Sequence, residues 1–402
     1  MPLVTKTLNH KVLMRIAFTI AFIQFTNALE YMMFNPIFAF MAADFAVPVS
    51  FSGYVSGMYT SGAVLSGIIA FYWIGRFNKK HFLIANMALL GLLTLFTTFI
   101  SSFSLLLTLR FCAGLVGGTT MGVGISILIN NAPTNVRGKM LATVIASFSM
   151  VSIIGMPIIL FLCTHYGWHV ALWIISILCL LALPLIVSII PHEPISFDKL
   201  HTQPIDVDTL LFASSNALVQ FSPMLVIPFL VPLMTQRLGA SQDLLPWLFF
   251  GGGVTGYLST KMTGVLTSRF SALILAIGST IVFILSLLIP LLGYQHAALF
   301  ITLFLGASYS RLVSSSAVSI KYPDDRQRAG FFSLQTSIMY MITTVAFFLS
   351  AFLLPDYGMA PQNVNILLAL CAISASGFPI IVFILQRKLV KRNVSPDHLI
   401  ID

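Results

Sequence analysis

The sequence predicts an all-α membrane protein in which twelve transmembrane helices form two pseudo-symmetric six-helix bundles. Apolar residues (AVILMFWYC) occupy 58% of its 402 positions and charged residues only 8%. A soluble globular domain carries about 25% charged residues, so most of this surface is expected to face lipid. A spanning helix needs about 20 mainly apolar residues, and twelve such runs follow one another along the chain.

Short polar segments between the apolar runs set the expected limits of the helices. The first six spans are expected at Arg15–Phe40, Gly53–Ile74, Phe82–Ser101, Leu105–Asn131, Met140–Cys163 and Val170–Ile190. The second six are expected at Thr209–Gln236, Leu244–Leu266, Ser271–Gly293, Ala297–Ile320, Gly330–Leu354 and Val364–Gln386. The first run has no small-residue cleavage site, so we expect a span there and not a secretory signal.

The placement of the basic residues tests this number of spans independently. With the N-terminus in the cytoplasm, 18 of the 21 Lys and Arg residues fall on the cytoplasmic side, as the positive-inside rule requires. The exceptions are Arg237 on the outer side and Arg110 and Arg311 within spans. One helix more or fewer would scramble this pattern, so we expect twelve spans with both termini in the cytoplasm.

The longest polar stretch divides the chain into two halves. We expect an N-terminal six-helix bundle over 1–190, a cytoplasmic linker over 191–208, a C-terminal six-helix bundle over 209–386 and a cytoplasmic tail over 387–402. Arg76-Phe77 after the second span and Arg269-Phe270 after the eighth lie at almost the same offset in their halves. Parallel six-helix repeats are a known transporter architecture.

Composition also disfavours several classes of protein. The formal charge of +9 is scattered in small groups, so there is no continuous basic patch for nucleic acid. The four cysteines stand singly in apolar runs, without the spacing of a metal site or a disulfide framework. No cluster of catalytic His, Asp or Ser is visible in the sequence. A membrane enzyme or a receptor-like scaffold is therefore the least favoured class of protein.

Prolines and glycines gather in particular spans. Pro223, Pro228 and Pro232 in the seventh span interrupt helical hydrogen bonds, which membranes tolerate where the backbone lines a cavity or acts as a hinge. Glycines from Gly114 to Gly124 in the fourth span and from Gly251 to Gly256 in the eighth predict close helix packing.

Four short segments carry a family resemblance through their order and spacing. They are Gly75-Arg76-Phe77-Asn78-Lys79-Lys80 after the second span, Arg110 to Gly114 in the fourth, Phe148 to Pro157 in the fifth, and Tyr166-Gly167-Trp168-His169 before the sixth. Together they resemble the major facilitator superfamily, particularly its twelve-helix drug:proton antiporter branch. The resemblance implies a conformational gating loop containing Arg76, Lys79 and Lys80. Gly75 stands where the family has an acidic residue.

Glu30 is the candidate for proton coupling. Of the twelve acidic residues, it alone lies deep in a predicted span. A charge near the bilayer centre costs about 2.5–3.5 kcal/mol on insertion scales, so it needs a partner or a purpose. A carboxyl group in such a place suits reversible protonation. The alternative is a structural acid that is hydrogen-bonded to a neighbouring helix.

Arg110 in the fourth span is the candidate partner of Glu30. The two residues lie at comparable depth, and the resemblance makes the first and fourth spans neighbours, so an ion pair is feasible. Protonation of Glu30 would then release Arg110 or free it for an anionic substrate. The alternative is an arginine that only anchors helix packing.

Five polar residues are candidates for substrate binding. At about 100° per residue, Asn27, Tyr31 and Asn35 fall on one stripe of the first span, and Asn216 and Gln220 lie on the seventh. A polar stripe on an otherwise apolar helix should face protein or a water-filled cavity. Hydrogen bonding between helices without any substrate is the alternative.

Arg311, near the middle of the tenth span, is the last candidate for substrate binding. It has no acidic partner within the predicted spans of its half, and such an arginine suits a carboxylate or phosphate group. It could instead bond backbone carbonyls. Two arginines against one glutamate within the spans favour an anionic or zwitterionic substrate.

These observations lead to one expected function and one rival. We expect a proton-coupled secondary transporter that exports a small molecule by alternating access, with no cofactor and the proton gradient as driving force. The rival is an importer or facilitator of a small metabolite such as an amino acid, nucleoside or siderophore. We expect a monomer in the bacterial cytoplasmic (inner) membrane, with the lipid bilayer and a small-molecule substrate as its partners and no nucleic acid.

Overall fold

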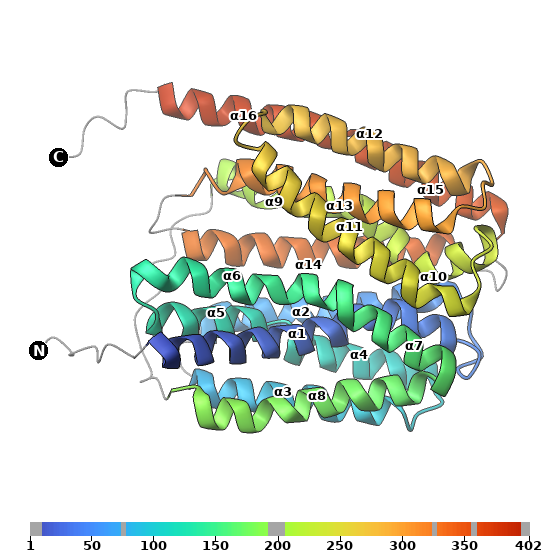
Figure 1. Ribbon diagram of the computed structural model, residues 1–402, viewed down its shortest axis with the longest axis horizontal. Helices are drawn as coiled ribbons and strands as arrows, with labels where there is room; N and C mark the ends of the chain where they lie inside the picture. Colours follow the sequence, from blue (N-terminus) through green and yellow to red (C-terminus); the bar gives the residue numbers. More distant parts are fainter. Residues whose placement is uncertain (1–9, 74–77, 192–205, 324–327, 355–359, 395–402) are drawn as a thin grey trace, which may run out of the picture. The chain divides into compact units, whose positions relative to one another are not determined.

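The computed structural model describes residues 10–73, 78–191, 206–323, 328–354 and 360–394, and every regular element in this part is a helix (Figure 1). Ten of these helices are long and apolar enough to cross a membrane. The predicted class of an all-α, multi-pass membrane protein is therefore confirmed. The chain separates into two compact units, unit 1 (Met1–His201 and Gln242–Phe250) and unit 2 (Thr202–Ser241 and Gly251–Asp402).

Unit 1 is built around its first helix. Its elements are α1 (His10–Met41), a 3-10 turn (Val49–Phe51), α2 (Ser52–Trp73), α3 (Lys79–Thr97), α4 (Phe103–Gly117), α5 (Thr120–Asn131), α6 (Thr134–Met150), a π turn (Val151–Gly155), α7 (Met156–Tyr166) and α8 (Trp168–Ile189). Helix α1 packs against α2, α5, α6, α7 and α8, while α2 pairs with α4 and α3 with α8. The central position of α1 explains why its polar residues are buried.

Unit 2 has a corresponding set of elements. They are α9 (Val207–Val226), a 3-10 turn (Ile227–Phe229), α10 (Leu230–Pro232), a π turn (Leu233–Arg237), α11 (Leu245–Leu266), α12 (Ala272–Leu291), α13 (Ala297–Ser319), α14 (Arg328–Leu353), α15 (Pro361–Ser376) and α16 (Phe378–Val394). Before α11 lies a further 3-10 turn (Gln242–Leu244), which belongs to unit 1 together with the first turns of α11. Helix α9 packs against α13, α14, α15 and α16, and α12 packs against α13.

Several predicted spans consist of more than one helical segment. The predicted seventh span contains α9, α10 and the turns around Pro228 and Pro232, where the missing backbone N–H groups divert the α-helix into 3-10 and π geometry. Pro223, by contrast, lies inside α9. The predicted fifth span is α6 and α7 joined by the π turn.

Two predicted spans are not among the ten membrane-crossing helices. The predicted spans Gly53–Ile74 and Leu244–Leu266 form the 22-residue helices α2 and α11. Both helices are rich in Gly, Ser and Thr, which lowers their mean hydropathy. The expected linker over 191–208 falls largely outside the described residues, and α16 continues to Val394, past the expected start of the tail at 387.

Glycines bring neighbouring helices into close contact. A Cβ atom added at Gly114 of α4 would lie 1.9 Å from the carbonyl oxygen of Tyr59 in α2, and one at Gly62 of α2 would lie 2.2 Å from that of Phe111. In unit 2, a Cβ at Gly256 would lie 2.5 Å from the Tyr309 ring. The close packing predicted for Gly114 and Gly256 is present, whereas a Cβ at Gly122 or Gly251, where it was also predicted, would meet nothing within 4 Å.

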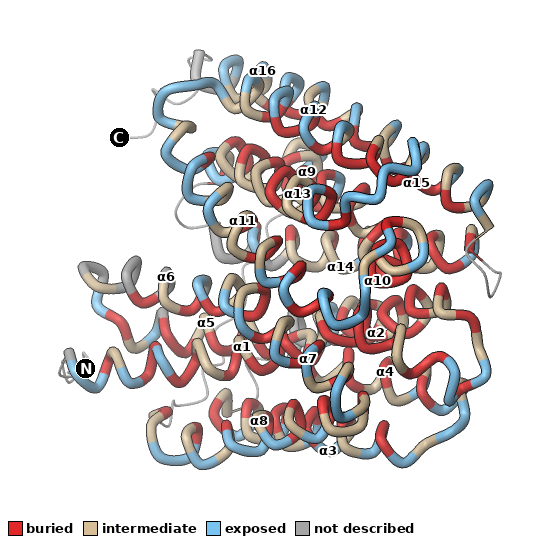
Figure 2. The backbone as a smooth tube through the Cα atoms, turned by 45° about the vertical axis from the view of Figure 1, so that its right-hand side comes forward, coloured by how far each residue is buried: buried red, intermediate tan, exposed pale blue. Residues whose placement is uncertain are grey.

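The outer faces of the helices are apolar. Ile274, Ile277, Ile281 and Leu285 are exposed and recur every three or four residues along α12, so they share one face of the helix. Figure 2 shows such exposed turns along α12 and α16. An exposed isoleucine stripe is suited to contact with lipid tails.

Candidate functional site

The centre of unit 1 contains a buried ion pair. Arg110 Nη1 on α4 donates a hydrogen bond to Glu30 Oε1 on α1, and Thr94 Oγ1 on α3 donates to the same oxygen over 3.3 Å. Glu30 is 0% exposed and Arg110 is 1% exposed. The structure thus brings together the two residues that were predicted to couple to protons.

Aromatic rings enclose the guanidinium group of Arg110. Its Cζ atom lies 3.7 Å from the centroid of the Phe34 ring and 4.8 Å from that of Tyr59. Glu30 Oε2, Arg110 Nε and Arg110 Nη2 have no hydrogen-bond partner among the described residues. A carboxyl group with one unoccupied oxygen can accept a proton without first displacing a neighbour.

The other predicted residues of α1 have different surroundings. The Tyr31 ring stacks on the Tyr59 ring with centroids 4.8 Å apart, which places it beside the ion pair. Asn27 Oδ1 has no hydrogen-bond partner among the described residues and lies 2.8 Å from where a Cβ at Gly117 would be. Asn35 Oδ1 accepts a hydrogen bond of 2.6 Å from Ser56 Oγ, so Asn35 links α1 to α2.

Arg311 lies inside unit 2 and is fully buried. Its Nη1 donates to Ser222 Oγ over 3.2 Å and its Nη2 to the Ala375 carbonyl over 3.3 Å. Its Cζ atom lies 4.5 Å from the Phe283 ring centroid and 5.3 Å from that of Phe378. No carboxylate in the described part of the chain forms an ion pair with it. Its positive charge is held by neutral oxygens and aromatic rings.

Asn216 and Gln220, the two residues of α9 predicted to bind substrate, lie on the same side of the helix, four residues apart. Asn216 Nδ2 donates to Ser316 Oγ of α13 over 3.0 Å, and Asn216 Oδ1 has no partner among the described residues. Gln220 is half-buried. Asn216 therefore contributes to packing and keeps one free acceptor.

Part of the predicted gating loop is described. Arg76 and Gly75 lie outside the described residues, and Lys79 is the first residue of α3. Lys80 Nζ donates to the Val187 carbonyl over 2.7 Å near the end of α8. A cation at the last carbonyls of a helix complements the helix dipole, so Lys80 stabilises the α3–α8 pair.

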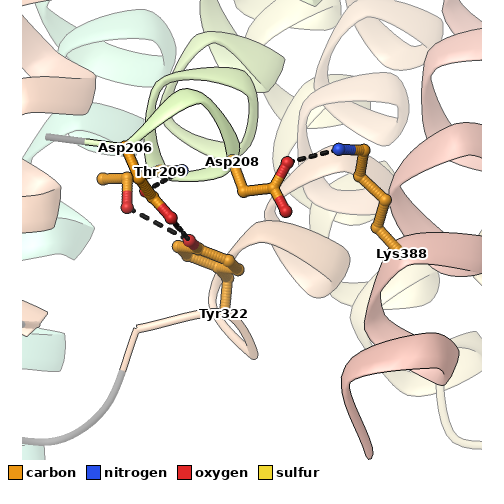
Figure 3. Close-up of polar contacts among 5 residues, drawn as sticks. All are labelled: Asp206, Asp208, Thr209, Tyr322 and Lys388. Atoms are coloured by element: carbon orange, nitrogen blue, oxygen red, sulfur yellow. Dashed lines mark hydrogen bonds and ion pairs between the residues drawn. The ribbon is translucent and has the colours of Figure 1, made fainter. Parts of the chain in front are cut away.

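Carboxylates link three elements at the start of α9 (Figure 3). Asp206 Oδ1 accepts a hydrogen bond of 2.8 Å from the backbone N–H of Thr209, and the Tyr322 hydroxyl donates to Asp206 over 3.3 Å. Hydrogen bonds from Thr209, together with the one from Tyr322, lower the pKa of Asp206 below its ordinary value. Lys388 of α16 pairs with Asp208, and both side chains are about 40% exposed or more.

Sequence reasoning did not identify the neighbours that complete these sites. Thr94, Phe34 and Tyr59 surround the ion pair, and Ser222 binds Arg311. Thr, Phe, Tyr and Ser are common amino acids in apolar spans. Only their contacts in the folded chain distinguish these four residues from the others of the same kind. In the described part of the chain, no group of three His, Cys, Asp or Glu residues could hold a metal ion.

Comparisons with known proteins agree with one another. Residues 20–207 match the family model described as Major Facilitator Superfamily. The purine ribonucleoside efflux pump NepI of Shigella sonnei (strain Ss046) is 22% identical over 359 residues, which cover 87% of this chain and 89% of that protein. A chloramphenicol resistance protein of Streptomyces lividans is 23% identical over 296 residues, which cover 69% of this chain and 73% of that protein.

Solved structures show the same fold. The crystal structure of a bacterial homologue of the human lysosomal transporter Spinster, in an inward-facing and occupied conformation, has a TM-score of 0.72 at 16% identity and covers 96% of this chain and 98% of that chain. The nucleoside transporter NupG has a TM-score of 0.72 at 12% identity and covers 93% of this chain and 99% of that chain. At these identities the likeness establishes the fold and no shared substrate.

Proposed function

We propose that the chain is a transporter of the major facilitator superfamily, whose model residues 20–207 match, and that it exports a small molecule in exchange for protons. One observation carries this proposal. Glu30 is a fully buried carboxylate that is paired with Arg110 and keeps one oxygen unoccupied. A buried ionisable group within a span costs free energy, and carrying a proton is a function that would explain why it is present.

The proposed proton step takes place at Glu30. A proton from the outer side binds Oε2, which has no other partner among the described residues. The neutral carboxyl holds the Arg110 guanidinium less strongly, while the Phe34 and Tyr59 rings still stabilise the cation. The altered α1–α4 contact favours the opposite state of an alternating-access cycle, and release of the proton inside restores the pair.

Replacing Glu30 by glutamine tests the coupling. The Glu30→Gln protein keeps the shape and the Arg110 hydrogen bond but cannot change charge, so we expect substrate export driven by a pH gradient in proteoliposomes to fall at least tenfold. Exchange of labelled substrate without a gradient should continue. The matched control is Asp243→Asn, the same chemical change at an exposed carboxylate. Gradient-driven export at the wild-type rate in Glu30→Gln would remove the coupling role.

The class of substrate is proposed from the relatives and from the charges. NepI is named a purine ribonucleoside efflux pump and NupG a nucleoside transporter, so purine ribonucleosides come first in a substrate panel. The buried charge of Arg311 supports anionic or zwitterionic molecules as the second class. We propose that Asn27 and Tyr31 contact substrate, with Asn35, Asn216, Gln220 and Arg311 as further candidates.

An importer or facilitator is the second candidate function, favoured by the nucleoside transporter among the matching folds. Its substrate could be an amino acid, a nucleoside or a siderophore. Uptake that follows the substrate gradient alone and persists with a protonophore would select this function over proton-coupled export.

We also propose the full topology. Helices α2 and α11 complete a set of twelve spans, six in each half of the sequence, arranged as two bundles. The loop containing Arg76, Lys79 and Lys80 gates the cycle from the cytoplasmic side. The protein acts as a monomer in the bacterial inner membrane, with both termini in the cytoplasm and no cofactor.

A further inference from the structure

Unit 2 contains a cavity that the transport proposal does not use. It has a volume of about 440 Å³ and lies between α11, α12 and α13, within the range of about 300–1,000 Å³ that is typical of ligand pockets. Its lining residues recur every three or four positions on each helix, so it is an elongated groove. From Thr255 to Leu266 along α11 it extends for about 16 Å at 1.5 Å per residue.

The walls of this groove have few free hydrogen-bonding groups. Thr255 Oγ1 donates to the Gly251 carbonyl over 2.8 Å, and Ser279 Oγ donates to the Leu275 carbonyl over 2.7 Å. Thr263 Oγ1 donates to Ser310 Oγ over 2.9 Å. Because hydroxyl groups bonded within or between their own helices have little left for a ligand, the groove presents mainly carbon. It is therefore suited to a hydrocarbon chain and not to a polar solute.

One end of the groove is open and basic. Met262 is 64% exposed and Phe270 is 48% exposed, and both line the groove. Arg269, which is exposed, directly precedes Phe270 in the chain and forms no ion pair with a described residue. Lys261 belongs to another face of α11, because its Nζ lies 4.8 Å from the centroid of the Tyr257 ring and Tyr257 does not line the groove.

We propose that this groove binds an anionic phospholipid, with one acyl chain between α11, α12 and α13 and the phosphate at Arg269. The apolar walls, the extended shape and the exposed cation at the open end each match one part of such a lipid. Anionic lipids are concentrated in cytoplasmic leaflets and attract nearby Lys and Arg residues. The site lies entirely in unit 2 and is independent of Glu30.

A glycine in the groove wall allows the acyl-chain site to be filled. Gly278 of α12 lines the groove, and a Cβ added there would meet nothing within 4 Å. Gly278→Leu therefore places a side chain in the space proposed for lipid, with a Cβ that meets no neighbouring atom. Gly264→Leu is the matched control, because a Cβ at Gly264 of α11 also meets nothing within 4 Å and Gly264 does not line the groove.

Native mass spectrometry of the purified full chain tests the site with dioleoyl phosphatidylglycerol and dioleoyl phosphatidylcholine as probes. The wild type and Gly264→Leu should retain phosphatidylglycerol at least about fivefold more tightly than phosphatidylcholine, since one cation near a membrane surface is worth about that factor. Gly278→Leu should lose the tightest-bound lipid. Arg269→Gln should bind both lipids equally well.

Three results would overturn the proposal. The first is equal retention of the two lipids by the wild type, and the second is unchanged phosphatidylglycerol binding by Gly278→Leu. The third is displacement of the lipid by a transported solute, which would assign the groove to the transport path. If Gly278→Leu does not fold, two other measurements test the same site. Arg269→Gln should lose the preference for phosphatidylglycerol, and phosphatidylglycerol with brominated chains should quench the fluorescence of Leu266→Trp.

Discussion

At the level of single residues, the two buried arginines differ in how their charge is compensated. Arg110 has the carboxylate of Glu30, whereas Arg311 has Ser222, the Ala375 carbonyl and two aromatic rings. Removing a guanidinium group from water costs several kcal/mol, and two neutral acceptors recover only part of this. The arginine in unit 2 is therefore an expensive residue for packing alone.

The cost of Arg311 leads to a test of its role. If Arg311 serves recognition of an anionic group, Arg311→Met removes an uncompensated charge, and the melting temperature in detergent should stay the same or rise. Transport of anionic substrates should fall at least tenfold. The comparison variant is Arg237→Met, whose parent side chain is only partly buried and donates to the Pro290 carbonyl and to Asn365. A lower melting temperature with unchanged transport in Arg311→Met would show a packing anchor.

Asp206 provides a prediction about pH. Because its pKa is lower in the folded chain than the ordinary value, the Asp206 carboxylate stabilises the fold above about pH 4. This contribution is lost as the pH falls through the lowered pKa. The melting temperature of the wild type should therefore fall more steeply with acid than that of Asp206→Asn, which keeps an N-cap side chain. Tyr322→Phe lacks one donor to the carboxylate, so the dependence of its melting temperature on pH should be intermediate. The same dependence on pH in all three proteins would contradict this account.

Sequence reasoning could select Glu30 and the two arginines, because a charge inside an apolar run is visible without a structure. It could not separate Asn35, which bonds Ser56, from Asn27, whose carbonyl oxygen has no partner among the described residues. Both lie on one stripe of α1, and the difference depends on which residue of α2 or α4 faces each of them. Only the packing of the helices determines which residue that is.

At the level of the helices, small residues determine how closely α2 and α4 approach. The backbone of Tyr59 occupies the space that any side chain at Gly114 would need. Tyr59 also contacts Arg110, so this approach positions one wall of the ion-pair site. Helix packing and the candidate site are therefore physically linked.

A pair of glycine variants tests this link. Gly114→Ala places a methyl group 1.9 Å from the Tyr59 carbonyl oxygen, so α2 and α4 must separate, at a cost of about 1–3 kcal/mol, as is typical of overpacking. We expect a lower melting temperature and impaired transport. Gly122→Ala in α5 adds a methyl group where nothing lies within 4 Å and should be neutral or slightly stabilising. Equal behaviour of the two variants would show that the close approach has no importance.

Sequence reasoning anticipated that apolar runs form helices and that prolines interrupt the seventh span, but it did not anticipate the π turn in the fifth. The π turn at Val151–Gly155 ends two residues before Pro157, which has no backbone N–H to bond the carbonyl of Ile153. A Cβ at Gly155 would lie 2.6 Å from Leu29 Cδ1 of α1. The geometry there depends on this proline and on contact with another helix, and only the contact is invisible in the sequence.

At the level of the whole molecule, the expected topology depends on α2 and α11. These helices fall outside the ten that are apolar enough to cross a membrane, although the alternation of basic residues requires both to cross. The charge distribution thus predicts that α2 and α11 cross the membrane, whereas their hydropathy does not. Labelling from each side of the membrane can decide between them.

Single cysteines introduced into a variant without Cys112, Cys163, Cys179 and Cys371 test the topology. With twelve spans, a membrane-impermeant thiol reagent should label the exposed positions Ser102→Cys and Ser241→Cys from outside, and Ser268→Cys only after the membrane is opened. If neither α2 nor α11 crossed, Ser102→Cys and Ser241→Cys would lie on the same side as the N-terminus and would be protected. Transport by the cysteine-free parent is the control for its fold.

The unoccupied oxygen of Glu30 has a consequence for the energetics of transport. Glu30 is the one buried acidic residue in the described part of the chain, and it offers a place for one proton. An exchanger that carries one proton per uncharged solute cannot build a solute gradient larger than the driving force of that proton. Each 100 mV of driving force is worth about 2.3 kcal/mol per charge, or about a 50-fold ratio of concentrations. Stoichiometry, set by a single carboxyl group, would then limit how far this protein can deplete the cell of its substrate.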